Sequence, residues 1–128
     1  MITLYRADAP GLSVIEGLTS WTSSREHALD YASGRFLVFG GPCLYRAEVD
    51  AGSVLDARGS LRQTLDEMGL DLDDYPNESP QDLCRALANI FRAHGHLWIA
   101  FRERPEPEFD EWLYLGDWPV AVLPNESA

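Results

Sequence analysis

The sequence contains no lysine, so all ten of its basic residues are arginines. They stand against 21 acidic residues, which gives a formal net charge of -11 at pH 7. An electrostatic field of that sign repels phosphate backbones, and the chain lacks the basic patch that nucleic-acid binding normally requires. We therefore expect a protein, rather than a nucleic acid, as any macromolecular partner.

Cysteine and histidine are scarce. Cys43 and Cys84 lie in apolar patterns with no second cysteine at metal-ligand spacing, and His94 and His96 straddle a predicted helix end. This pattern predicts no metal site. Long apolar runs are also missing: no segment approaches the roughly 18 residues that a spanning helix needs, and no signal-peptide pattern is present. We expect a cytoplasmic protein that does not contact a membrane.

The motifs of several common enzyme classes are absent. There is no Gly-x-Ser-x-Gly sequence, and Gly40-Gly41 is followed by Pro42 rather than by the Lys and Ser or Thr of a phosphate-binding loop. The acidic segment 70–80 lacks the glycine and the distal glutamate of a calcium-binding loop, so we interpret it as a solvated linker.

The residues that are present suffice for one packed domain. The chain has 128 residues, of which 45% are hydrophobic, including four Trp, five Tyr and five Phe. We predict a single domain over residues 1–128, with a frayed tail at 124–128.

Hydrophobic periodicity predicts the strands of the chain, and capping signals predict where its helices begin. Alternating or apolar runs predict strands at 2–6, 18–22, 43–49, 96–101, 111–115 and 120–123. Helix starts are predicted at a capping box from Ser23 to Glu26, at a second box from Ser60 to Gln63, and at Ser79-Pro80. Strands dominate the last third and the helices are segregated, which predicts an α+β fold rather than a doubly wound parallel sheet.

Four polar residues lie where strands end or begin. Arg6 ends the first predicted strand, Ser20 and Thr22 lie where a strand gives way to a helix, and Glu111 opens a strand after a proline-rich acidic loop. Such residues are suited to binding a ligand at the rim of a cleft. By residue type alone they are more typical of solvated strand ends and ordinary cap residues.

The order of these segments resembles the mono-ADP-ribosyltransferase superfamily of the Arg–Ser–Glu kind. The resemblance rests on Leu-Tyr-Arg6, Leu-Thr-Ser20-Trp-Thr22, the helix 26–32, the strand 44–49 and Glu111-Trp-Leu-Tyr-Leu115. It implies a split β-sheet core with a few segregated helices, and NAD as the substrate.

The resemblance also implies a role for each candidate residue. Glu111 would be the catalytic carboxylate, and Arg6 would clamp the pyrophosphate or the ribose of NAD. Ser20 and Thr22 would brace the glutamate and the ribose, while Trp21 or Tyr31 would stack on the nicotinamide.

This sequence departs from the family pattern in two places. Ser20-Trp-Thr22-Ser23 only approximates the Ser-Thr-Ser of the family. Phe109 stands two residues before Glu111, where arginine-modifying members carry Glu, so arginine is a doubtful acceptor. A literal Glu-x-Glu at 106–108 keeps Glu108 open as an alternative to Glu111.

The resemblance implies transfer of ADP-ribose to a macromolecule, as in compact bacterial toxins and phage-encoded proteins, an anti-CRISPR transferase among them. Two alternatives remain open at this point. One is an NAD-degrading toxin that uses water or phosphate as acceptor. The other is an acidic protein-binding module on the same fold, without the chemistry.

Overall fold

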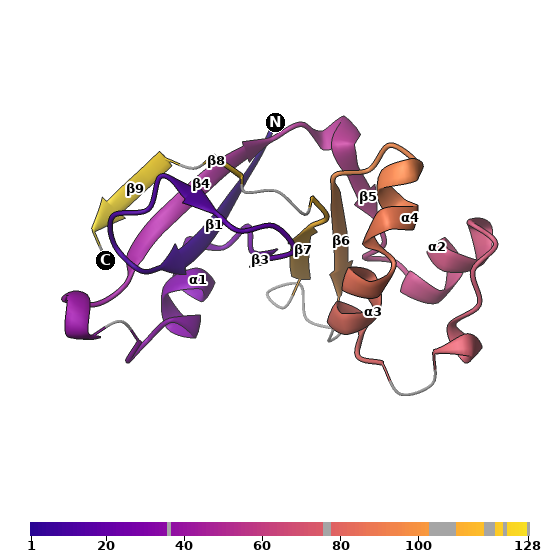
Figure 1. Ribbon diagram of the computed structural model, residues 1–128, viewed down its shortest axis with the longest axis horizontal. Helices are drawn as coiled ribbons and strands as arrows, with labels where there is room; N and C mark the ends of the chain where they lie inside the picture. The colour runs from indigo at the N-terminus through magenta and orange to yellow at the C-terminus, as the bar shows by residue number, and fades with distance from the viewer. Residues whose placement is uncertain (36, 76–77, 103–109, 117–119, 122, 128) are drawn as a thin grey trace.

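The chain folds into a mixed α+β structure of short helices and open sheets, which confirms the predicted fold class (Figure 1). The computed structural model describes residues 1–35, 37–75, 78–102, 110–116, 120–121 and 123–127. The strands are β1 (Ile2–Asp8), β2 (Val14–Ile15), β3 (Ser20–Trp21), β4 (Cys43–Val49), β5 (Val54–Asp56), β6 (Trp98–Arg102), β7 (Asp110–Tyr114), β8 (Val120–Ala121) and β9 (Leu123–Ser127). The helices are α1 (Arg25–Tyr31), α2 (Leu61–Glu67), α3 (Pro80–Ala86) and α4 (Ala88–Ala93), with short 3₁₀ turns η1 (Leu37–Phe39), η2 (Ala51–Ser53) and η3 (Leu72–Asp74).

Two sheets form the centre of the molecule. One has the strand order β1-β4-β9 and the other has the order β3-β7-β6-β5, while β2 and β8 form a small separate pair. All described pairings are antiparallel except β5 with β6. Among the described residues, one isolated bridge, between Tyr5 and Thr22, joins the two larger sheets. Helix α1 lies against the β1-β4-β9 sheet, and α3 and α4 lie on the far side of the other sheet (Figure 1).

The strand β7 supplies side chains to both hydrophobic clusters of the core. Trp112 and Tyr114 belong to the cluster between the two sheets. Leu113 and Leu115 belong to the cluster beneath α2, α3 and α4. Because side chains alternate across a strand, Glu111 points to the same face as Leu113 and Leu115. Packing of β7 from both sides therefore fixes the backbone that carries Glu111.

Helix starts follow the capping chemistry of the sequence in two of three cases. The Ser60 hydroxyl accepts a hydrogen bond from the amide of Gln63, and the Ser79 hydroxyl accepts one from Asp82, as predicted. The predicted cap at Ser23 is wrong, because the adjacent Ser24 accepts the bond from His27.

The apolar pattern from Pro80 onward does not form one continuous helix. It is divided into α3 and α4 at Leu87, whose ψ of 5° departs from helical values. Leu87 itself is buried, so the break turns the chain without removing apolar surface from the core.

The C-terminal end differs from the predicted frayed tail. Residues of β9 pair with β4 in antiparallel register, from Cys43 opposite Ser127 to Arg46 opposite Leu123. The reason is that β4 pairs with β1 on one side only, and its other edge presents backbone groups that a further strand can satisfy.

Candidate functional site

A cavity of about 520 Å³ lies where β1, β3 and β7 meet, beside α1 and the start of α3. Except for the alternative Glu108, which lies outside the described residues, the sequence-indicated site candidates all line it. These residues are Arg6, Ser20, Trp21, Thr22, Tyr31 and Glu111. Segments more than a hundred residues apart in the sequence thus meet around one cavity. The predicted order of the strands and helices did not by itself establish this proximity.

Glu111, the second residue of β7, is held at one wall of this cavity. The Ser20 hydroxyl donates a hydrogen bond to its Oε2 atom at 3.3 Å. The side-chain amide of Gln81, from the first turn of α3, donates to the same oxygen at 3.4 Å and also to the Ser20 hydroxyl oxygen. The carboxylate is therefore oriented by neighbours from two other elements.

Arg6 joins the end of β1 to β3. Its Nε atom donates to Asp8 Oδ2 at 3.1 Å, and one terminal nitrogen donates to the Ser20 carbonyl oxygen at 2.8 Å. The second terminal nitrogen makes no hydrogen bond to any residue that the structure describes, and the side chain is 28% exposed on the cavity wall. That nitrogen is available for an anionic ligand.

The two candidate aromatic rings have opposite environments. Trp21 is only 2% exposed, packs edge-on against Trp98 at 5.9 Å between ring centroids, and donates its indole N–H to the Thr19 hydroxyl. Tyr31 is 70% exposed, and the Arg35 guanidinium lies 5.0 Å from its ring centroid. The Trp21 ring is thus part of the core, and Tyr31 is the ring of the two that a ligand can stack on.

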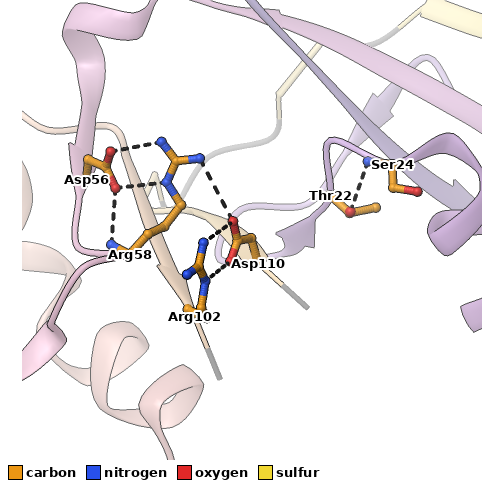
Figure 2. A network of polar contacts seen from close by, with 6 residues as sticks. All are labelled: Thr22, Ser24, Asp56, Arg58, Arg102 and Asp110. Atoms are coloured by element: carbon orange, nitrogen blue, oxygen red, sulfur yellow. Dashed lines mark hydrogen bonds and ion pairs between the residues drawn. The ribbon is translucent and has the colours of Figure 1, made fainter. Parts of the chain in front are cut away.

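Thr22 is largely committed to local structure. It is 8% exposed, and its hydroxyl oxygen accepts a hydrogen bond from the Ser24 amide at 3.1 Å, directly before α1 (Figure 2). Its backbone forms the bridge to Tyr5. Thr22 therefore orders the turn between β3 and α1, and it closes the seam between the two sheets.

Sequence reasoning missed several polar residues of the cavity, chiefly Gln81, Arg85 and Arg35. Gln81 and Arg85 are four residues apart on α3, so they share one helix face. The Arg85 Nε atom donates to the Leu18 carbonyl at 3.0 Å, next to the start of β3. The same helix also carries the exposed Asp82, so polar residues at positions 81 and 85 gave no distinct signal in the sequence.

A network of two arginines and two aspartates lies where β5 and β6 end and β7 begins (Figure 2), and Asp110 of this network also lines the cavity. Arg102 binds Asp110 through two nitrogens, at 2.6 and 3.3 Å. Arg58 binds Asp56 through two nitrogens, at 2.9 and 2.8 Å, and a third lies 3.9 Å from Asp110. Asp110 immediately precedes Glu111, so these ion pairs anchor the start of β7.

Arg58 also determines the ionisation of its partner. The hydrogen bonds from Arg58 are the main reason that the pKa of Asp56 falls to about 2. The same guanidinium lies 5.3 Å from the ring centroid of Trp112, whose side chain is buried. Arg58 thus connects the surface ion pairs to the core of β7.

Replacing Arg58 with Ala is expected to destabilise the protein by about 1 kcal/mol at pH 7, after allowing for the solvent exposure of its ion pairs. The folded-state pKa of Asp56 lies below its ordinary value, so its stabilisation is present above pH 4 and is lost as the pH falls through about 2. The difference between wild type and variant should therefore shrink in acid.

Urea unfolding at pH 7 and at pH 2.5 measures this difference. Arg62→Ala is the matched control, because Arg62 pairs with Asp73 at 3.4 Å with both side chains well exposed. Equal destabilisation by the two substitutions at pH 7 would contradict the anchoring role of Arg58.

Beneath Glu111, the Cys84 thiol is fully buried. Burial, and in second place the nearby charge of Glu111, raise the pKa of Cys84 to about 12. The thiol is therefore neutral at ordinary pH and is not a nucleophile of the site.

Within the described ranges, no group of three or more His, Cys, Asp and Glu side chains is placed to hold a metal ion, and no helix there is long and apolar enough to cross a membrane. Glu108, the alternative to Glu111, lies outside the described residues.

We compared the chain with protein-family models, with curated proteins and with solved structures, and none of the three comparisons found a match. The function must therefore be argued from the geometry of the cavity.

Proposed function

We propose that the protein is a mono-ADP-ribosyltransferase that cleaves NAD and transfers ADP-ribose to a protein. The observation that carries the proposal is the Glu111 carboxylate, which Ser20 orients inside a cavity that also contains Arg6. This is the Arg, Ser and Glu set that the sequence resemblance implied, and the three residues come from three different strands.

The chemistry needs a fixed negative charge beside the ribose. The bond between nicotinamide and C1′ of the ribose breaks, the bonding electrons leave with nicotinamide, and positive charge develops on the ribose. A preoriented carboxylate stabilises that charge and binds the 2′-hydroxyl. The acceptor nucleophile then bonds to C1′ and loses its proton. Glu111 has the position and the orienting partners for this role.

The charges of the cavity suit the dianionic pyrophosphate of NAD, despite the net charge of the whole chain. Three of the ten arginines, Arg6, Arg35 and Arg85, line it. Two of its acidic residues are engaged in ion pairs, Asp8 with Arg6 and Asp110 with Arg102. Local arginines therefore offset the repulsion that the overall charge of -11 exerts on a pyrophosphate.

The shape of the site suits a substrate with two halves joined by an anionic linker. A second cavity of about 540 Å³ adjoins the first, and the two share Arg6, Asp8 and Thr19. We place the nicotinamide riboside beside Glu111 and Tyr31, the pyrophosphate at Arg6, and the adenosine toward the second cavity.

Labelled NAD distinguishes this function from the alternatives. The protein is incubated with NAD that carries the label on adenine, with and without a cell lysate, and nicotinamide is measured in parallel. Label that becomes attached to a lysate protein supports the proposal. Nicotinamide release without transfer would instead indicate an NAD-degrading enzyme. Absence of both NAD turnover and NAD binding would contradict either activity and favour a binding module.

A further inference from the structure

The helix α3 brings a polar face to the cavity, although its sequence pattern is that of a core helix. Leu83 and Cys84 are fully buried against the sheet. Gln81 and Arg85, one turn apart, line the cavity instead. A helix that only filled the core would not need a glutamine aimed at a carboxylate.

The hydrogen bonds around Gln81 have one consistent set of donors and acceptors. The Gln81 amide nitrogen donates to the Ser20 hydroxyl oxygen and lies 3.4 Å from Glu111 Oε2. A hydroxyl has a single proton, and an oxygen that accepts from the amide directs that proton elsewhere. The Ser20 proton is thereby directed to Glu111 Oε2, 3.3 Å away.

We propose that Gln81 is a positioning residue for Glu111: its amide fixes the Ser20 hydroxyl and the Glu111 carboxylate in the one arrangement that is competent for catalysis. This inference rests on the proposed function, in which Glu111 acts on NAD. It adds a fourth residue, from a helix, to the three strand residues that the resemblance indicated.

The residue type matters for this role. Glutamine offers donors without charge, so it binds an ionised carboxylate without neutralising it. Methionine has a similar length but no donor, and it would release both partners. Glutamate would place a second carboxylate within hydrogen-bond distance of the first, and such a pair shares a proton.

Two substitutions test the proposal, with a matched control. Gln81→Met is expected to lower kcat for NAD cleavage about 10- to 100-fold, because a reacting group that is no longer held in place loses that order of rate. The KM for NAD should change less than about threefold, since Gln81 acts through Glu111 rather than through ground-state binding. Gln81→Glu is expected to change the pH dependence of kcat. The pH below which kcat falls should rise by about one unit or more, because the two carboxylates share a proton.

The control uses Gln63 on α2, whose amide donates to the exposed Glu67 at 3.4 Å, far from the cavity. Gln63→Met and Gln63→Glu should leave kcat and its pH profile at wild-type values. The charged and titratable residues around Glu111 are the same in all of these proteins, namely Arg6, Asp8, His27, Tyr31, Arg35, Arg85, Asp110 and the neighbouring Cys84. A shift of the acid limb in Gln81→Glu therefore reports the new carboxylate.

Carboxyl-carbon NMR of the ligand-free protein tests the same contact without NAD. In Gln81→Glu, the carboxylates at 81 and 111 should titrate in two steps separated by more than about one pH unit. Independent titration of the two groups, or a wild-type kcat in Gln81→Met, would overturn the proposal. If the carboxylates at 81 and 111 titrate together but the protein does not turn over NAD, the contact between the two positions is supported and the proposed function is contradicted.

Discussion

Replacing Glu111 with Gln is expected to lower NAD cleavage about 10²- to 10³-fold, which is typical for loss of one preorganised electrostatic group in an active site. Glutamine keeps the shape of the side chain and its ability to accept from Ser20 and Gln81. What it removes is the negative charge that, in the proposed reaction, stabilises the developing positive charge on the ribose. The effect should fall on kcat, measured as nicotinamide release at saturating NAD.

The chain supplies a close control for this substitution. Glu48 on β4 is an exposed strand glutamate whose Oε2 accepts from the Thr3 hydroxyl at 2.8 Å, so it also pairs with a hydroxyl on a neighbouring strand. Glu48→Gln should leave turnover unchanged. A Glu111→Gln protein with undiminished turnover would remove Glu111 from the catalytic role, and Glu108 would be the next carboxylate to test.

Replacing Arg6 with Ala is expected to weaken NAD binding about 10- to 100-fold, the equivalent of losing one or two hydrogen bonds to a charged group. Arg6 lies between the two cavities, and one of its terminal nitrogens is available to an anion. Arg6→Lys should recover only part of the affinity, because an ammonium group preserves the charge but not the planar fork.

Calorimetry with NAD measures this affinity directly, and the Glu111→Gln background prevents the substrate from being consumed. Arg62→Ala, which removes an exposed arginine of α2, controls for the change in net charge. Arg6 also donates to the Ser20 carbonyl at 2.8 Å, so thermal unfolding of each variant is needed to separate binding from stability. Unchanged affinity in a folded Arg6→Ala protein would restrict Arg6 to its structural role.

Local chemistry explains which parts of the fold could be predicted from the sequence. Strand β4 was predicted with its observed bounds, because its alternation and flanking turns are contained within a few residues. Ser60 and Ser79 were recognised as caps because the bond spans three residues. By contrast, β9 depends on the free edge of β4, about eighty residues earlier, and the parallel pairing of β5 with β6 depends on contacts more than forty residues apart.

The residues of the candidate site divide in the same way, into those that a short sequence pattern indicates and those that only tertiary packing brings to the cavity. Arg6, Ser20 and Glu111 were indicated because a short pattern predicted each of them at a strand end, although β1 continues past Arg6 to Asp8. Gln81 carries no such pattern, since a glutamine in the first turn of a helix is ordinary. Only the docking of α3 against β3 and β7 brings it to Glu111.

The single bridge between Tyr5 and Thr22 has a consequence for detecting ligands. Its two backbone hydrogen bonds, at 2.7 and 3.0 Å, join the two sheets beside the bond from Arg6 to the Ser20 carbonyl, and both residues line the cavity. A molecule bound across that junction contacts both sheets and opposes their local separation. The exchange of these two amide protons with solvent deuterium should therefore slow when the cavity is filled. Tyr5 and Thr22 thus form an intrinsic reporter with which ligands can be screened before any reaction is known.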